Sequence, residues 1–198
     1  MSDKKTLGIY DAKAQDYAKL TVDDAKNADL AAFIDFLPNG GRALDLGCGP
    51  GQHAAQMARR GLNVEATDAS GEMVKLAAQN EGVSARQETF DDLNGFETYD
   101  GIYANFSLLH AQRTKVPEHV STIARALKPG GIFHIGMKTG AGEERDGIGR
   151  RYSYFSEAEL EKMLTDNGLT VLRRNHGEDI GLSGEMAEWV ILQSKKDT

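Results

Sequence analysis

The sequence predicts an α/β protein with a doubly wound, mostly parallel sheet of about seven strands, an antiparallel last strand and an N-terminal helical cap. Short apolar runs alternate with helical segments from residue 42 onward, which is typical of parallel strands joined by crossover helices. A glycine-rich turn, "DLGCGPG", follows the first apolar run at residues 45–51. The chain has 198 residues and no internal repeat, so we expect a single domain, 1–198, with the cap over 1–38 and the core over 42–194.

The N-terminal cap is predicted to be helical. Residues 12–36 are rich in helix-forming side chains, and Leu30, Phe33 and Ile34 make the end of this segment apolar. The turn "LPNGG" at residues 37–41 ends the helical pattern.

Strands and helices then alternate along the core. Ser70 and Ser156 precede helical segments as N-caps, and Gly61 follows another as its C-cap. The predicted strands are residues 43–46, 63–67, 84–89, 99–105, 132–138, 169–174 and 185–194. The predicted helices are residues 53–61, 70–82, 117–127 and 156–168. The glycine-rich, charged segment over residues 139–151 is predicted to be a lid.

Composition and charge exclude several classes of protein. A formal net charge of −7 and a pI near 5.3 give no positive footprint for nucleic acid, so we expect no such partner. No apolar run approaches the roughly 20 residues of a membrane helix, so we expect no membrane association. The single cysteine, Cys48, excludes an internal disulfide and a zinc site built on cysteine pairs. The N-terminus lacks the apolar stretch of a secretory signal, and we expect a cytoplasmic monomer or homodimer.

The glycine-rich turn predicts a ligand site. In a doubly wound sheet the ligand crevice lies beyond the carboxyl ends of the strands, beside the first strand-to-helix loop. Gly47, Gly49 and Gly51 permit positive φ there and let a ligand approach the backbone. Asp68 follows at the spacing of roughly 20 residues that brings a carboxylate to a ribose hydroxyl. The dinucleotide pattern G-x-G-x-x-G fails at Gln52, which indicates a ribose without a pyrophosphate.

Five segments, taken in order, resemble the class I S-adenosylmethionine-dependent methyltransferases, a Rossmann-like family. They are "LDLGCGPG", "ATDASGEM", "TFDDL", "YDGIYANFSLLH" and "ALKPGGIF", and they fall at the family's spacing over residues 43–137. Each segment alone is a weak signal, whereas five in order are a strong one. The resemblance implies S-adenosylmethionine as cofactor, S-adenosylhomocysteine as its product, and no metal.

The resemblance also implies which residues contact the cofactor. The turn from Gly47 to Gly51 would hold the methionine part, Asp68 both ribose hydroxyls, and Met73 the adenine. Asp45 is expected to hold the glycine turn by accepting backbone N–H bonds, or to approach the cofactor ammonium through water.

The remaining implied contacts come from the later segments and the cap. Thr89 and Phe90 would border the adenine edge, although the family more often has an Asp where Thr89 stands. Asn105 and Phe106 would lie under the sulfonium, and Tyr17 would cover the cofactor. The full set is Tyr17, Asp45, Gly47, Cys48, Gly49, Gly51, Asp68, Met73, Thr89, Phe90, Asn105 and Phe106.

His110 is the candidate catalytic base. It follows the fourth strand on the crevice side, and an ordinary histidine pKa suits proton transfer near neutral pH. A purely structural role for His110 is an equal alternative. We expect His53 to be an exposed first-turn residue and His134 a core histidine, with His119 and His176 facing solvent. Five histidines without i, i+4 pairing predict no metal site.

Two further features allow more than one interpretation. Cys48 is a small loop filler rather than a nucleophile. The cluster "RRYSYF" at residues 150–155 is either a substrate wall, where Arg150 or Arg151 meets an acidic group, or a lid hinge.

The predicted activity is methyl transfer from S-adenosylmethionine to a small-molecule nucleophile by in-line displacement. The family's enzymes that methylate adenine or glutamine nitrogens typically carry Asn or Asp followed by Pro-Pro in the fourth segment, whereas this chain has "NFSLLH". One alternative is a catalytically inactive S-adenosylmethionine-binding sensor or partner subunit. Another is a dinucleotide oxidoreductase, which Gln52 disfavours.

Overall fold

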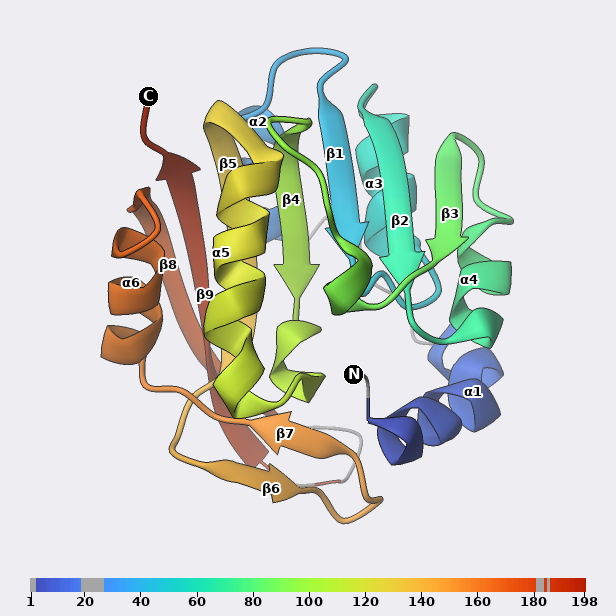
Figure 1. Cartoon of the computed structure of the whole chain (residues 1–198). Coiled ribbons are helices and arrows are strands. Elements are labelled where there is room, and N and C mark those ends of the chain that lie inside the picture. Colours follow the sequence, from blue (N-terminus) through green and yellow to red (C-terminus); the bar gives the residue numbers. More distant parts are fainter. Residues whose placement is uncertain (1–2, 19–26, 181–183, 185) are drawn as a thin grey trace.

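The computed structural model describes residues 3–18, 27–180, 184 and 186–198 (Figure 1). Its main sheet has seven strands in the order β3-β2-β1-β4-β5-β9-β8, as predicted. The strands are β1 (Arg42–Leu46), β2 (Asn63–Asp68), β3 (Val83–Gln87), β4 (Tyr99–Asn105), β5 (Leu127–Lys138), β8 (Leu169–Ile180) and β9 (Met186–Lys196). The described helices are α1 (Lys4–Ala18), α2 (Ala28–Asp35), α3 (Gln52–Arg59), α4 (Gly71–Ala77), α5 (Val116–Ala126) and α6 (Glu157–Thr165).

The strand order reverses at β1, which creates the crevice. β1 pairs in parallel with β2 on one side and with β4 on the other. The strand β9 runs antiparallel between β5 and β8, which confirms the predicted antiparallel last strand. In Figure 1 the carboxyl ends of the parallel strands point to the lower edge. There α1 and a hairpin of β6 (Glu143–Arg145) and β7 (Arg151–Ser153) lie below the sheet.

Two hydrophobic layers cover the faces of the sheet and fix the crevice in place. On one face lie α5 and α6, where Val116, Val120 and Ile123 recur at helical spacing and are fully buried. On the other lie α2 and α3, with Phe33 and Met57 fully buried. Because both faces are covered, the central strands are continuous apolar runs rather than alternating ones.

The helical cap differs from its prediction in where its helices begin and end. In place of a helical segment over residues 12–36, the structure has α1 and α2, and residues 19–26 lie outside the described part. The helix α1 begins early because the Asp3 carboxylate caps it, accepting from the Thr6 N–H at 3.1 Å and the Thr6 hydroxyl at 2.6 Å. The side chain of Asn27 caps α2 by accepting from the Leu30 N–H at 3.0 Å.

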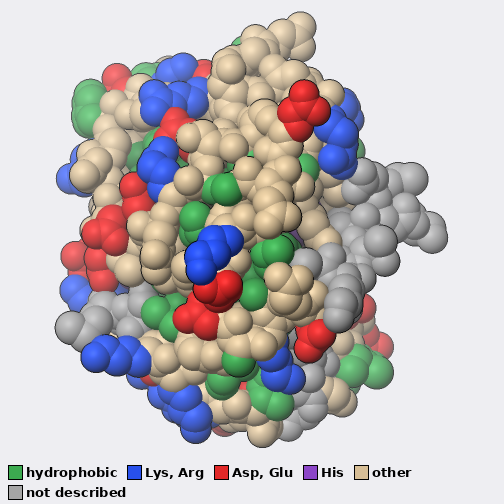
Figure 2. Space-filling view, turned by 90° about the vertical axis from the view of Figure 1, so that its right-hand side faces the viewer, with side chains coloured by type: hydrophobic (Ala, Val, Ile, Leu, Met, Phe, Trp, Pro, Cys, Tyr) green, Lys and Arg blue, Asp and Glu red, His purple; other side chains and the backbone are tan. Residues whose placement is uncertain are grey.

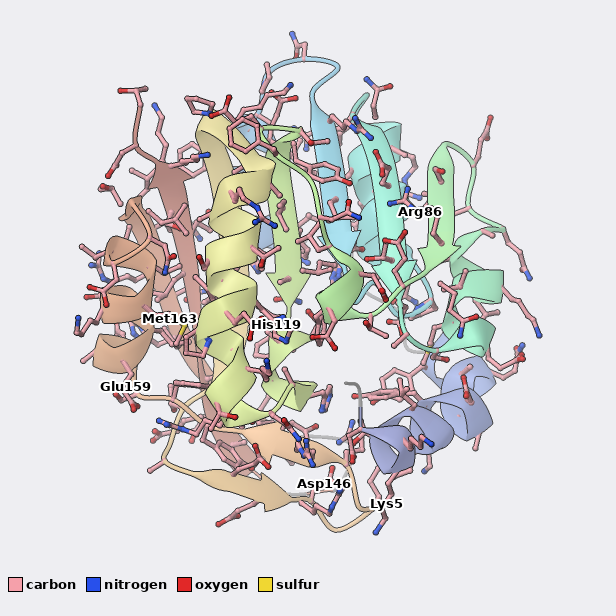
Figure 3. The ribbon with its side chains drawn as sticks, viewed as in Figure 1. Lys5, Arg86, His119, Asp146, Glu159 and Met163 are labelled. Atoms are coloured by element: carbon pink, nitrogen blue, oxygen red, sulfur yellow. The ribbon has the colours of Figure 1, made fainter. Side chains whose placement is uncertain are left out.

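The predicted lid segment, residues 139–151, contains regular structure. β6 and β7 pair antiparallel, and the hairpin that they form contacts α1. The Arg145 guanidinium donates to the two carboxylate oxygens of Asp3 at 2.8 and 2.9 Å. Figure 3 shows Asp146 in the turn of this hairpin, on the side where Lys5 of α1 lies. The hairpin and the cap helix therefore meet over the crevice.

The face shown in Figure 2 has acidic and basic side chains interspersed, with hydrophobic side chains only in small separate groups. Within the described ranges, no helix has both the length and the apolar character needed to cross a membrane.

Gly51→Ala should destabilise the fold by about 2–4 kcal/mol. Gly51 has φ +79°, and an added Cβ would lie 2.8 Å from the Cβ of Ala77 on α4. Gly61 is the matched control, because its φ is +87° but an added Cβ meets no atom within 4 Å. We expect Gly61→Ala to lose only about 1–2 kcal/mol. Urea unfolding measures both variants, and equal losses would contradict the packing argument.

Candidate active site

A cavity of about 460 Å³ lies at the crevice. The loops that follow β1, β2, β3 and β4 form one side of it, and α1 and β7 form the other. The residues predicted from the sequence as site residues line this cavity, with the exception of Gly51, which caps α3. A volume of this size is in the range of small-molecule and cofactor sites.

Strand β2 holds the glycine turn. The N–H groups of Gly47 and Cys48 donate to the Thr67 carbonyl at 2.7 and 2.9 Å. The Gly49 N–H donates to Asp68 Oδ2 at 2.9 Å. Gly47 has φ +77°, and an added Cβ would lie 2.4 Å from a side-chain carbon of the loop after β4. At Gly49 an added Cβ would meet nothing within 4 Å, so a ligand can approach this part of the turn.

Asp45 is buried at the end of β1 and faces the cavity. Its Oδ2 has no hydrogen-bond partner within the described residues. Burial, together with the charge of Asp68, raises the pKa of Asp45 to about 7. Asp68 accepts from the glycine turn itself, and Asp45 has a hydrogen bond with the backbone of Ala54 in the first turn of α3.

Asp68 connects the glycine turn to α4. Besides the Gly49 N–H, its carboxylate accepts the Ser70 N–H at 2.8 Å through Oδ1. Ser70 in turn caps α4 by accepting from the Met73 N–H at 3.2 Å. Burial raises the pKa of Asp68, and these backbone donors act against the shift. Met73, only 2% exposed, lines the cavity beside them.

A hydrogen-bond chain fixes Asn105 at the end of β4. Gln193 Nε2 donates to His134 Nδ1 at 3.1 Å, so the His134 proton resides on Nε2. That Nε2–H donates to Asn105 Oδ1 at 3.1 Å. His134 is fully buried and stacks on Tyr103 with ring centroids 3.9 Å apart, which agrees with the expectation of a core histidine.

Phe106, Thr89 and Phe90 line the same cavity. Phe106 has φ +51°, an uncommon backbone conformation for a residue with a side chain, and its N–H donates to the Gly136 carbonyl at 3.0 Å. The Thr89 hydroxyl donates to Asp92 Oδ2 at 2.8 Å in a capping box that begins a 3-10 turn at Phe90–Asp92.

His110 lies in the wall of the cavity with both ring nitrogens engaged. Its Nδ1 is 2.6 Å from the Arg151 carbonyl, which can only accept, so the proton resides on Nδ1. Nε2 therefore accepts from the Tyr10 hydroxyl at 2.6 Å. Burial lowers the pKa of His110 to about 4, so the ring is neutral at pH 7. A proton that reaches Nε2 has to pass through the Tyr10 hydroxyl.

Arg150 links the hairpin to α1. It is 2% exposed, and its Nε donates to Asp146 Oδ2 at 2.8 Å. Its Nη1 donates to the hydroxyls of Tyr17 and Tyr10 at 2.7 and 3.2 Å. The guanidinium also lies over the ring of Tyr152, 5.2 Å from its centroid. Arg150 thus lines the cavity, as the substrate-wall interpretation requires, and its acidic partner within the chain is Asp146.

The other histidines differ in part from expectation. His119 is 7% exposed and lies against Phe90 with ring centroids 5.6 Å apart, so its prediction as a solvent-facing residue is wrong. His53 is half-buried and lines the cavity, packed edge-on against Tyr103, rather than exposed. His176 is exposed, as predicted, and pairs with Glu157.

The lone cysteine behaves as a filler of the loop. Cys48 is buried, and its Sγ donates to the Gly49 carbonyl at 3.3 Å. Burial, with the charges of Asp45 and Asp68, raises the pKa of the Cys48 thiol well above its ordinary value, opposite to what a nucleophile needs. Across the described residues, no cluster of three or more His, Cys, Asp or Glu is arranged to hold a metal.

Sequence analysis missed Tyr10 and Lys138, which both line the cavity. Tyr10 precedes Tyr17 by two helical turns, and this spacing brings both to one face of α1. Once α1 is recognised as a helix, that spacing is a usable signal. Lys138 ends β5 at the carboxyl edge of the sheet, where its position alone marks it as a crevice residue.

Comparison with known proteins gives consistent matches. A model of the methyltransferase domain family matches residues 43–131. The chain is 36% identical over 106 residues to the ubiquinone biosynthesis O-methyltransferase of Xanthomonas oryzae, covering 48% of this chain and 42% of that protein. It is 33% identical over 122 residues to the trans-aconitate 2-methyltransferase of Deinococcus radiodurans, covering 57% of this chain and 44% of that protein. The matches thus span less than half the length of these curated relatives.

A solved structure has the same fold over nearly the whole chain. It is that of the 1,6-didemethyltoxoflavin-N1-methyltransferase of Burkholderia thailandensis, with bound 1,6-didemethyltoxoflavin and S-adenosylhomocysteine. The TM-score is 0.75 at 20% identity, with 98% of this chain and 88% of that chain covered.

The sheet order, the glycine turn and the matched domain define a Rossmann-like methyltransferase domain. The match over residues 43–131 and the fold support the class I S-adenosylmethionine-dependent methyltransferase family, which the five sequence segments indicated.

Asp45→Asn should stabilise the unliganded protein at pH 8 by about 2 kcal/mol or more. The folded-state pKa of Asp45, about 7, is above the ordinary value of 3.8, so folding disfavours the ionised carboxylate. The contribution of Asp45 to wild-type stability should therefore fall as pH rises from 4 to 7, and the gain from the variant should vanish near pH 4. Urea unfolding at several pH values measures this, and a gain independent of pH would contradict the assignment.

Proposed function

We propose that this protein transfers the methyl group of S-adenosylmethionine to a small-molecule acceptor. The observation that carries the proposal is a single cavity with two kinds of lining. Backbone turns and carboxylates suited to a nucleoside lie on one side, and a wall of tyrosines, His110 and Arg150 lies on the other.

The residues of the first side fit S-adenosylmethionine. Asp68 is fixed by backbone donors and has carboxylate lone pairs left to accept from ribose hydroxyls. The unpartnered Asp45 Oδ2 is an acceptor suited to a cationic amino group. The open backbone at Gly49 permits close approach of the methionine part. We propose the remaining contacts on Met73, Thr89, Phe90, Asn105, Phe106 and Tyr17 as predicted.

The second side favours a small acceptor. The helix α1 and the β6–β7 hairpin meet over it, so the acceptor has to fit within the space that they cover. The two relatives and the solved structure described above are named for ubiquinone biosynthesis, trans-aconitate and 1,6-didemethyltoxoflavin, which supports a small molecule rather than nucleic acid. A cytoplasmic location and a monomeric or homodimeric state stay predictions.

The chain's own contribution to the reaction is alignment. The cofactor supplies an activated methyl group: a lone pair of the acceptor bonds to the methyl carbon while the carbon–sulfur bond breaks and its electrons stay on sulfur. Alignment of reactants can lower a barrier by roughly 7–11 kcal/mol. Asn105 and Phe106, which are held by hydrogen bonds, provide a fixed surface against which the reactants can align. For an acceptor that carries a proton, His110 would take it at Nε2 by way of the Tyr10 hydroxyl.

The first experiment measures binding of S-adenosylmethionine, S-adenosylhomocysteine, NAD and NADP by thermal shift, followed by homocysteine-release assays with acceptors. Ligand at 100 times its dissociation constant adds about 2.7 kcal/mol. We expect shifts with the first two ligands only. Asp68→Ala should weaken S-adenosylhomocysteine by about 10- to 100-fold, and the exposed Asp166→Ala should not. A thermal shift with NAD would favour the dinucleotide oxidoreductase. Binding of S-adenosylmethionine without any turnover would favour the inactive sensor or partner subunit.

His110→Ala should lower kcat by roughly 100-fold or more with an acceptor that must lose a proton. The dissociation constant of S-adenosylhomocysteine should stay unchanged, because His110 contacts α1 and β7 rather than the glycine turn. The wild-type pH–rate profile should have an acidic limb that the variant lacks. An unchanged kcat, or the same limb in both proteins, would remove His110 as the base.

A further inference from the structure

A chain of hydrogen bonds runs from α2 through the core to the cavity. It begins at the Asp29 backbone carbonyl in the first turn of α2, to which Gln193 Nε2 donates at 2.6 Å. The same Nε2 donates to His134 Nδ1, and His134 Nε2 donates to Asn105 Oδ1, each at 3.1 Å. Gln193 and His134 are fully buried and Asn105 lines the cavity, so the chain joins the core to the site.

The carbonyl at the beginning of this chain fixes the direction of every hydrogen bond in it. A backbone carbonyl can only accept, so the Gln193 atom that faces the Asp29 carbonyl is the amide nitrogen. The second hydrogen of this amide is donated to His134 Nδ1. Burial lowers the pKa of His134 well below its ordinary value, so the ring is neutral and its single proton is on Nε2. The Asn105 atom that faces this N–H must then be the carbonyl oxygen.

The packing around Asn105 agrees with this orientation. Asn105 pairs with Gly136 across β4 and β5, and a Cβ at residue 136 would lie 2.7 Å from Asn105 Oδ1. The glycine thus leaves the room that the carbonyl oxygen occupies. Because its partner His134 is fully buried, the Asn105 carbonyl is directed into the core. The NH2 group of Asn105 is therefore the end of the side chain left for a ligand in the cavity.

We propose that Asn105 presents its amide N–H groups to the methyl acceptor and that the atom which accepts the methyl group is an oxygen. The inference rests on the proposed function and adds the chemical class of its substrate, namely hydroxyl or carboxyl compounds rather than amines. His134 and Gln193 are positioning residues that act through Asn105.

An N–H donor at this place favours oxygen over nitrogen because of their lone pairs. The positive end of an N–H bond is unfavourable beside a sulfonium and favourable beside the electron-rich atom that attacks it. An oxygen has two lone pairs or more, so one accepts from Asn105 Nδ2 while another bonds to the methyl carbon. The electrons of the broken carbon–sulfur bond stay on sulfur, and the proton of a hydroxyl acceptor passes through the Tyr10 hydroxyl to His110.

A neutral amine fits the same site poorly. It has a single lone pair, which it needs for the methyl carbon, so it cannot also accept from Asn105. Its own N–H groups would need the Asn105 carbonyl, which already accepts from His134.

The first test compares oxygen and nitrogen acceptors on the full chain with S-adenosylmethionine, by homocysteine release. The probes are hydroxybenzoates with the matching aminobenzoates, catechol with 1,2-diaminobenzene, lactate with alanine, and succinate with 1,4-diaminobutane. We expect kcat/KM for the best oxygen acceptor to exceed that for its amino counterpart by about 10-fold or more.

Variants of the chain test the contact itself. Asn105→Asp replaces the N–H donors by an acceptor, and it should lower kcat/KM for the oxygen acceptor by about 10- to 100-fold. The value for the amino counterpart should stay within about threefold of wild type, as should the dissociation constant of S-adenosylhomocysteine. His134→Phe keeps a ring against Tyr103 but removes the donor to Asn105, so the preference for oxygen should fall by about 10-fold.

Asn167→Asp is the matched control. Asn167 Nδ2 donates to the Met163 carbonyl at 2.8 Å at the end of α6, so its amide has a structural partner elsewhere in the fold. We expect this variant to retain the wild-type kcat/KM for both members of each pair.

The wild-type protein also gives a readout that needs no acceptor. ¹⁵N NMR of the imidazole nitrogens distinguishes the two neutral tautomers, and we expect His134 to carry its proton on Nε2 from pH 6 to 8. A proton on His134 Nδ1, or a charged ring over this range, would overturn the orientation of the Asn105 amide.

Amino compounds that serve as well as oxygen compounds, or an unchanged kcat/KM for oxygen acceptors in Asn105→Asp, would overturn the inference. Weaker binding of S-adenosylhomocysteine by Asn105→Asp with an unchanged KM for the acceptor would do the same, because the amide would then serve the cofactor. Binding of S-adenosylhomocysteine with turnover of no oxygen acceptor would also overturn it and leave the proposed cofactor intact. A protein that binds neither S-adenosylmethionine nor S-adenosylhomocysteine would contradict the proposed function itself.

Discussion

The attachment of the glycine turn to β2 is the constraint on which the rest of the site depends. Three consecutive N–H groups, from Gly47 to Gly49, donate to the Thr67 carbonyl and the Asp68 carboxylate. These bonds fix where α3 begins, because Gly51 caps it two residues later. They also hold the Asp68 carboxylate in place, and among the described residues the neighbouring Asp45 Oδ2 has no hydrogen-bond partner. The geometry of the nucleoside side thus follows from one short set of backbone hydrogen bonds.

The acceptor side is built differently, from side chains that cross between distant parts of the chain. Arg150 joins Asp146 of the hairpin to Tyr10 and Tyr17 of α1, and His110 joins Tyr10 to the backbone of β7. Buried polar groups of this kind are costly unless they are satisfied together. The cap and the hairpin therefore depend on each other for their placement. The predicted lid is one half of a two-part cover, and α1 is the other half.

The sequence was sufficient for the sheet, because each strand in it is marked locally. The apolar run at residues 43–46, the cap at Ser70 and the capping box at Ser156 need no knowledge of distant residues. The cavity-lining positions of the five segments were predictable from their resemblance to the methyltransferase family. The start of α1 was missed because its cap, Asp3, precedes a segment without a strong apolar period.

His110, Arg150 and Tyr17 were expected near the site, but the contacts among them could not be predicted, because these contacts join residues that local pattern does not connect. Tyr10 and His110 are 100 residues apart in the chain, and Arg150 and Tyr10 are 140 apart. The burial of His119 against Phe90 did have a local signal, because His119 lies three residues after Val116 and four before Ile123, on the buried face of α5. Sequence reasoning located the carboxyl edge of the sheet correctly, and the side chains that meet there required the fold.

The raised pKa of Asp45 has a consequence for ligand binding. With a pKa of about 7, the buried carboxyl holds a proton in roughly half of the unliganded molecules at neutral pH. A cationic group that binds against it favours the ionised form, so the proton leaves as the ligand enters. Uptake of such a ligand is then coupled to proton release, and its apparent affinity increases with pH until Asp45 is fully ionised.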